Sequence, residues 1–89
     1  MPRKALLIAG FVRDPHGQPV QAARVFFVSS PAALPDIAAL TDARGVFTLS
    51  VPVQGRYEVR AVSDRLGSAT ATVEVHNKGA TGVVIELGK

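Results

Sequence analysis

Three stretches of the sequence decide the fold: GFVRDPHGQPVQAARV at residues 10–25, TDARGVFTL at residues 41–49 and GRYEVRA at residues 55–61. The first two each hold a turn that opens on an aspartate and closes on a glycine, Asp14–Gly17 and Asp42–Gly45. In such turns glycine supplies a positive φ, and the aspartate carboxylate can accept backbone N–H groups. The residues around the turns are rich in Val, Phe and Tyr, which is typical of β-strands.

Working outward from these turns, short β-rich runs alternate with turn signals along the rest of the chain. This spacing is typical of an all-β sandwich or barrel. We predict strands at residues 5–12, 22–29, 46–51, 56–63, 68–76 and 83–87, with a short seventh strand at residues 38–41. Pro31 and Pro35 argue against a helix in the segment between the second strand and the short one.

Apolar and polar residues alternate in the later strands. Val73 and Val75, for example, alternate with Thr72 and Glu74. A strand with one dry and one wet face belongs to an antiparallel sheet packed against a second sheet. The 89 residues are enough for one domain. We therefore predict a single domain over residues 1–89, an antiparallel Greek-key β-sandwich of six to seven strands.

The order of these motifs resembles the carboxypeptidase regulatory-like domain family, whose members share a transthyretin-like β-sandwich. The resemblance covers about residues 6–75, and the matching positions are Gly10, Val12, Asp14, Gly17, Pro19, Val20, Ala22, Ala23, Val25, Thr41, Asp42, Gly45, Phe47, Gly55, Tyr57 and Val59. It implies a non-catalytic accessory domain. Six of these residues, Asp14, Gly17, Pro19, Asp42, Gly45 and Gly55, are predicted to shape turns, which specifies a fold better than a function.

The first two predicted strands break the alternation, because both of their faces are apolar. If Ile8 and Val25 point inward, four other apolar side chains point outward, namely Leu7, Phe11, Phe26 and Val28. An apolar outward surface can bind a partner. The alternative is that the loop at residues 30–37 folds back and covers it with Leu34 and Ile37.

The composition offers little for catalysis, so we predict no enzyme activity, no cofactor and no metal site. The chain has no cysteine and two histidines, His16 and His76, which have no spaced carboxylate partner. No Ser-His-Asp pattern or phosphate-binding loop occurs. The net charge is +3, but the basic residues are scattered, which argues against nucleic-acid binding.

We therefore predict a non-catalytic structural or protein-interaction module, either an accessory domain or a small subunit of a larger assembly. A protein partner or the other domains of a parent chain would bind it, and a homo-oligomer is left open. A carbohydrate-binding module is the alternative, although the chain has no Trp and its sole tyrosine, Tyr57, is expected inward. A domain with an isopeptide bond, as in adhesins, is a third interpretation, in which Lys4, Glu58 and Glu86 are the available residues.

The N-terminal apolar run, residues 5–12, resembles a signal peptide only in part, because no small-residue cleavage site follows it. It is also too short to span a membrane, which takes roughly 20 residues. As written, the chain would be cytoplasmic; if it was excised from a longer secreted protein, it would be extracytoplasmic.

Overall fold

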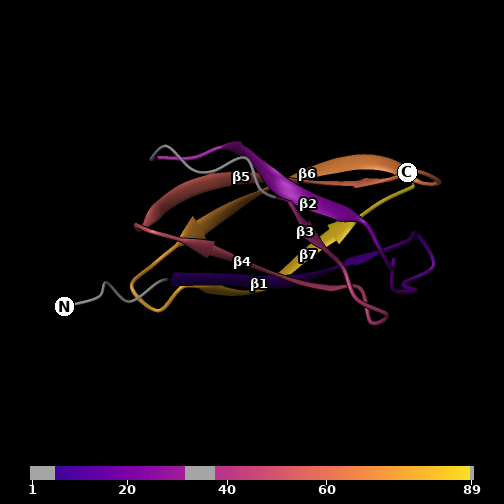
Figure 1. Ribbon diagram of the computed structural model, residues 1–89, viewed down its shortest axis with the longest axis horizontal. Coiled ribbons are helices and arrows are strands. Elements are labelled where there is room, and N and C mark those ends of the chain that lie inside the picture. Colours follow the sequence, from indigo (N-terminus) through magenta and orange to yellow (C-terminus); the bar gives the residue numbers. More distant parts are fainter. Residues whose placement is uncertain (1–5, 32–37, 89) are drawn as a thin grey trace.

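In the computed structural model, which describes residues 6–31 and 38–88, the chain forms two β-sheets packed face to face (Figure 1). The strands are β1 (Leu6–Arg13), β2 (Arg24–Ser29), β3 (Ala39–Leu40), β4 (Val46–Val51), β5 (Gly55–Ser63), β6 (Gly67–Val75) and β7 (Ala80–Glu86). One sheet has the order β4-β1-β7 and the other the order β3-β2-β5-β6. This architecture confirms the predicted all-β sandwich with seven strands.

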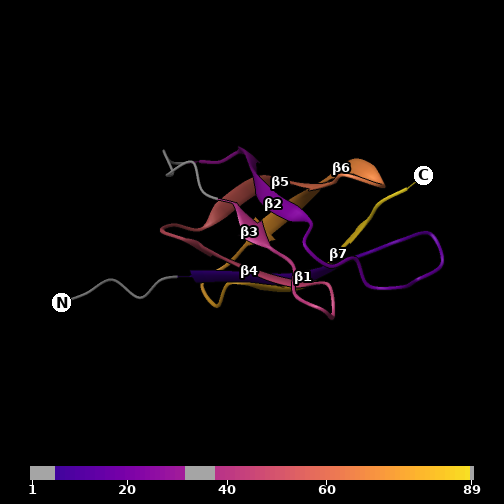
Figure 2. The ribbon, with the colours of Figure 1, turned by 45° about the vertical axis from the view of Figure 1, so that its right-hand side comes forward.

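One strand pair departs from the antiparallel arrangement that the sequence predicted. β1 and β7 run parallel, whereas every other pair is antiparallel. The chain reaches β7 from β6, which lies in the opposite sheet, so no hairpin fixes the direction of β7 against β1. The start of β1 and the end of β7 therefore lie toward opposite ends of the sandwich, as both ribbon views show (Figures 1 and 2).

The core lies between the sheets and consists of the inward side chains of both. Its members are Ile8, Val12, Val20, Ala23, Val25, Phe47, Leu49, Val51, Tyr57, Val59, Ala61, Val73, Val75, Ile85 and Leu87. Tyr57 is fully buried, and its ring lies against Phe27 with the centroids 5.4 Å apart. Its hydroxyl donates to the Val53 carbonyl oxygen at 2.7 Å. Burial raises the pKa of Tyr57 above its ordinary value.

β1 and β7 approach each other closely at Gly10. A Cβ atom built on Gly10 would lie 2.2 Å from the carbonyl oxygen of Val83, a distance that no real side chain could adopt. The register of the two strands shifts between Ile8 and Gly10. Glycine at position 10 is therefore required for β7 to pair with β1.

The strand boundaries differ from the sequence prediction mainly where the backbone turns. The second strand begins at Arg24 rather than at residue 22, because Ala22 adopts a left-handed conformation with φ of 62°. The last strand begins at Ala80, before the predicted Val83, and accommodates the left-handed Gly82. A β-propensity pattern does not anticipate such irregular strand ends.

Candidate functional site

The two aspartate turns have the same structure. Asp14 accepts the backbone N–H groups of His16 and Gln18, both at 2.9 Å. Asp42 likewise accepts those of Arg44 and Val46, at 2.9 and 3.0 Å. These two hydrogen bonds hold the pKa of Asp42 below its ordinary value. In both turns one carboxylate oxygen, Oδ1, thus holds the backbone of the turn.

The other predicted turn residues also support the backbone. Gly17, Gly45 and Gly55 adopt positive φ values of 82°, 75° and 144°. Gly45 lies so close to β1 that an added Cβ would be 2.5 Å from the carbonyl oxygen of Val12. Pro19 forms an isolated β-bridge with Arg13 after the first turn.

The four apolar residues predicted to form one outward surface are not brought together. Leu7 and Phe11 belong to β1, in the sheet β4-β1-β7, whereas Phe26 and Val28 belong to β2, in the other sheet. The outward sides of the two sheets face away from each other. Alternation along a strand indicates which side chains point outward, but it does not indicate to which sheet the strand belongs.

The outward side of the sheet β4-β1-β7 is apolar. We call it the apolar face; its members are Leu7, Ala9, Phe11, Val46 and Val84, with Thr48 and Ser50 along β4. Phe11 is half-buried at the centre, because it lies opposite Val46 on one side and Val84 on the other. Leu7, Val46 and Val84 remain 49%, 40% and 41% exposed.

The apolar face carries no unpaired charge among its described residues. Its two ionisable side chains, Arg13 and Glu86, lie opposite each other at the ends of β1 and β7. They form an ion pair with Nε and Oε2 3.3 Å apart, although Nε lacks hydrogen-bond geometry. Each charge is thus compensated by its neighbour, and the rest of the face is neutral.

The outward side of the sheet β3-β2-β5-β6, which we call the charged face, has the opposite character. Its ionisable side chains are Arg24, Arg56, Glu58, Arg60 and Glu74. Arg56 donates to Glu74 at 2.8 Å, which raises the pKa of the guanidinium group. Its apolar members are Phe26, Val28, Leu40 and Val62; Phe26 lies opposite Arg60, and Val62 lies opposite Arg24.

Sequence reasoning missed Val46 and Val84 as members of a surface. The alternation in the last strand does place Val84 outward, and Val46 begins a strand whose alternate residues are buried. The missing information was that β4 and β7 flank β1, which puts both residues beside Phe11. Strand order, rather than residue type, assembles the apolar face.

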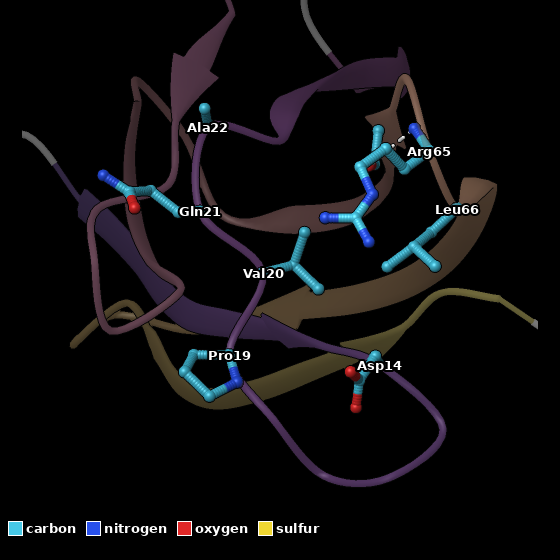
Figure 3. A pocket seen from close by; sticks show the side chains of 8 residues that line it. Asp14, Pro19, Val20, Gln21, Ala22, Arg65 and Leu66 are labelled. Carbon is cyan, nitrogen blue, oxygen red and sulfur yellow. Dashed lines mark hydrogen bonds between the residues drawn. The ribbon is translucent and has the colours of Figure 1, made fainter.

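A shallow pocket lies at one end of the sandwich, between the β1–β2 connection and the β5–β6 turn (Figure 3). It has a volume of about 460 Å³ and is lined by Asp14, Pro19, Val20, Gln21, Ala22, Ser63, Arg65 and Leu66. Val20 and Leu66 give it apolar walls, and Arg65 reaches across toward Val20. Asp14 lines it as well, but one carboxylate oxygen of Asp14 already holds the turn. The residues lining the pocket thus include one positively charged side chain, Arg65, and do not form a catalytic group.

Two further observations concern chemistry and membranes. Within residues 6–31 and 38–88, no three His, Cys, Asp or Glu side chains gather in a way that could hold a metal ion. None of the described residues form a helix long and apolar enough to cross a membrane. The predicted covering residues Leu34 and Ile37, and Lys4 of the isopeptide interpretation, lie outside the described residues.

Several solved structures have a similar fold. A DUF3823 family protein from Parabacteroides merdae superposes with a TM-score of 0.72 at 16% identity, over 98% of this chain and 47% of that one. A cohesin–X-dockerin complex from Acetivibrio cellulolyticus superposes with a TM-score of 0.67 at 16% identity, over 92% of this chain and 56% of that one. A proposed carbohydrate-binding protein from Pseudomonas aeruginosa superposes with a TM-score of 0.63 at 17% identity, over 92% of this chain and 88% of that one. An enzyme, (S)-allantoin synthase, superposes with a TM-score of 0.64 at 14% identity, over 94% of this chain and 41% of that one.

At such low identity these likenesses show the fold alone, and the chain spans about half the length of the first two of these structures. No curated protein sequence matches the chain. The sequence does match the carboxypeptidase regulatory-like domain over residues 7–88, which is nearly its whole length. The fold, the two aspartate turns and this match agree: the chain belongs to the carboxypeptidase regulatory-like domain family.

Proposed function

We propose that this domain is a non-catalytic interaction module and that it binds a protein partner through the apolar face. The observation that carries the proposal is the row Val46–Phe11–Val84, in which two exposed valines flank a half-buried phenylalanine across three strands. Apolar side chains gathered on the outward side of a sheet cost free energy in water, and binding a partner removes that cost.

The chemistry of the apolar face specifies the kind of partner. Because Arg13 and Glu86 neutralise each other and the remaining residues are uncharged, the face has no free charge to offer a charged ligand. A charged partner surface would lose its hydration there without compensation. We therefore expect a folded protein surface that is itself apolar and uncharged, such as a neighbouring domain or another subunit.

A second role, that of a rigid connector, is favoured by the parallel pairing of β1 with β7. β1 begins toward one end of the sandwich and β7 ends toward the other (Figure 1), so tension applied at these two points would run along both strands. All of the hydrogen bonds between them would then be loaded together in shear. We expect pulling by atomic force microscopy to require a higher force from the two termini than from a pair of points across the β5–β6 hairpin.

A carbohydrate-binding role has less support. Sugar-binding platforms usually stack an exposed Trp or Tyr on the sugar ring. The chain has no Trp, and its sole tyrosine, Tyr57, is fully buried. A glycan array that gave a reproducible hit would favour this role over the protein-interaction module.

Site-specific photo-cross-linking tests the main proposal and identifies the partner in the same experiment. A photoreactive phenylalanine analogue is placed at Val84 on the apolar face or, as a matched control, at the similarly exposed Val28 on the charged face. After irradiation in an extract of the native organism, we expect one discrete adduct from position 84 and none from position 28. Adducts from position 28 alone would exclude the apolar face as the binding surface.

A further inference from the structure

The four edge strands of the sandwich differ in how well they are protected from pairing with another chain. β4 and β7 form the edges of one sheet, and β3 and β6 form the edges of the other. An edge strand presents unpaired N–H and C=O groups, and proteins usually protect it by shortness, bulges, proline or charge.

Three of the four edges have such protection. β3 has only two residues. β7 is irregular, because its register shifts along β1 and Gly82 has a φ of 74°. In β4 the first residue is Val46; its backbone N–H donates to the Asp42 carboxylate, and its carbonyl oxygen accepts the Asp42 N–H. Pro52 directly follows the last residue of β4.

β6 has the least protection of the four edges. It runs for nine residues, Gly67–Val75, and pairs with β5 in one unbroken register. It contains no proline, and Glu74 is its only charged residue. Among the described residues, no backbone group from Ser68 to Val75 bonds to any backbone other than that of β5. Every second residue of β6 therefore directs an N–H and a C=O away from the sheet.

We propose that the free edge of β6 pairs antiparallel with β6 of a second copy of this chain, about a two-fold axis at Ala71. In this register Thr70 lies opposite Thr72 of the second copy, and Ser68 lies opposite Glu74 of the second copy. Both outward pairs can form hydrogen bonds, and neither joins like charges. On the inward side Ala69 lies opposite Val73 of the second copy, which avoids a steric clash. The edge is thus complementary to itself, as a two-fold interface requires.

The proposed interface is small. One strand edge on each side buries less than the roughly 1,200–2,000 Å² of a standard stable interface, so the association is weak. We expect a dissociation constant between about 10 µM and about 1 mM. Sedimentation equilibrium over this concentration range should show an average mass that rises from 9.3 kDa toward twice that value.

Charged variants of β6 locate the interface. Thr70→Lys/Thr72→Lys places lysine opposite lysine at two symmetric positions, and both threonines are exposed in the single chain. We expect this variant to raise the dissociation constant at least about 10-fold. The Thr70→Glu/Thr72→Glu variant should do the same. An equimolar mixture of the two variants should associate, because each lysine then faces a glutamate.

The matched control is Thr48→Lys/Ser50→Lys, which adds the same charges to exposed β4 positions of the apolar face. It should leave self-association unchanged, so the edge of β6 and the apolar face are tested separately. A wild-type chain that stays monomeric at about 1 mM would overturn the proposal. So would loss of self-association in the β4 variant but not in the β6 variants, or failure of the mixture to associate.

Discussion

The two outward faces of this sandwich obey the same alternation of buried and exposed residues, yet their chemistry is opposite. The charged face carries arginines, glutamates and threonines along β5 and β6, and Arg56 and Glu74 pair across it. The apolar face carries Leu7, Phe11 and valines at the same kind of outward position. One outward face is thus chemically suited to water and the other to an apolar partner, which is the binding role that we propose for the apolar face.

The largest effect is expected from breaking the strand pair that assembles the apolar face. In Gly10→Ala the new methyl group collides with the carbonyl oxygen of Val83, and β7 must move away from β1. We expect a loss of about 3 kcal/mol in the free energy of unfolding, measured by urea denaturation.

Gly17→Ala is the control for this substitution. Its φ of 82° strains an alanine, but no atom lies within 4 Å of the new methyl group. It should cost about 1 kcal/mol. Equal losses in the two variants would mean that the close approach of β1 and β7 is unimportant.

The next effect separates the two faces by partner affinity. Phe11→Ser removes the central ring of the apolar face, whereas Phe26→Ser removes a half-buried ring from the charged face. By calorimetry with the partner identified by cross-linking, we expect Phe11→Ser to weaken binding about 100-fold, or about 2.8 kcal/mol. Phe26→Ser should change it less than about 2-fold, provided that circular dichroism shows both variants folded. Equal weakening would remove the distinction between the faces.

A smaller effect concerns the point at which the chain crosses from one sheet to the other. Thr41 is buried between β3 and β4; its hydroxyl donates to the Val20 carbonyl oxygen at 2.6 Å and accepts the Ala23 N–H at 2.9 Å. Thr41→Val leaves both groups buried without a partner and should cost about 2 kcal/mol. Thr41→Ser keeps the hydroxyl, so its loss in the free energy of unfolding, measured by thermal denaturation, should be about half that of Thr41→Val.

The smallest effect is on acid stability. Because the pKa of Asp42 is lower in the folded chain than its ordinary value of 3.8, ionised Asp42 contributes stability above that value. The contribution is lost as the pH falls through the folded pKa. An asparagine side chain at this position can still accept hydrogen bonds but does not titrate. The stability advantage of the wild-type chain over Asp42→Asn should therefore shrink between about pH 5 and about pH 2. If urea denaturation gave the same difference in the free energy of unfolding between the wild-type chain and Asp42→Asn at every pH, this role of Asp42 would be contradicted.

Much of the fold could be predicted from local patterns, because alternation and turn chemistry are local properties. The bounds of β4 were predicted without error, and Ile8 and Val25 are buried as expected. The grouping of Leu7 and Phe11 with Val46 and Val84 could not be predicted, since it depends on strand order. Nor could the direction of β7, because side-chain alternation is the same in parallel and antiparallel strands.

The central claim is that a partner covers the apolar face and leaves the charged face in water, and cross-saturation NMR on the methyl-labelled domain bound to that partner tests it directly. The chain provides matched exposed probes: Leu7, Val46 and Val84 on the apolar face, and Val28 and Leu40 on the charged face. When the partner is irradiated, we predict that the methyl signals of Leu7, Val46 and Val84 lose intensity while those of Val28 and Leu40 do not. Loss confined to Val28 and Leu40, or equal loss at all five residues, would contradict the account.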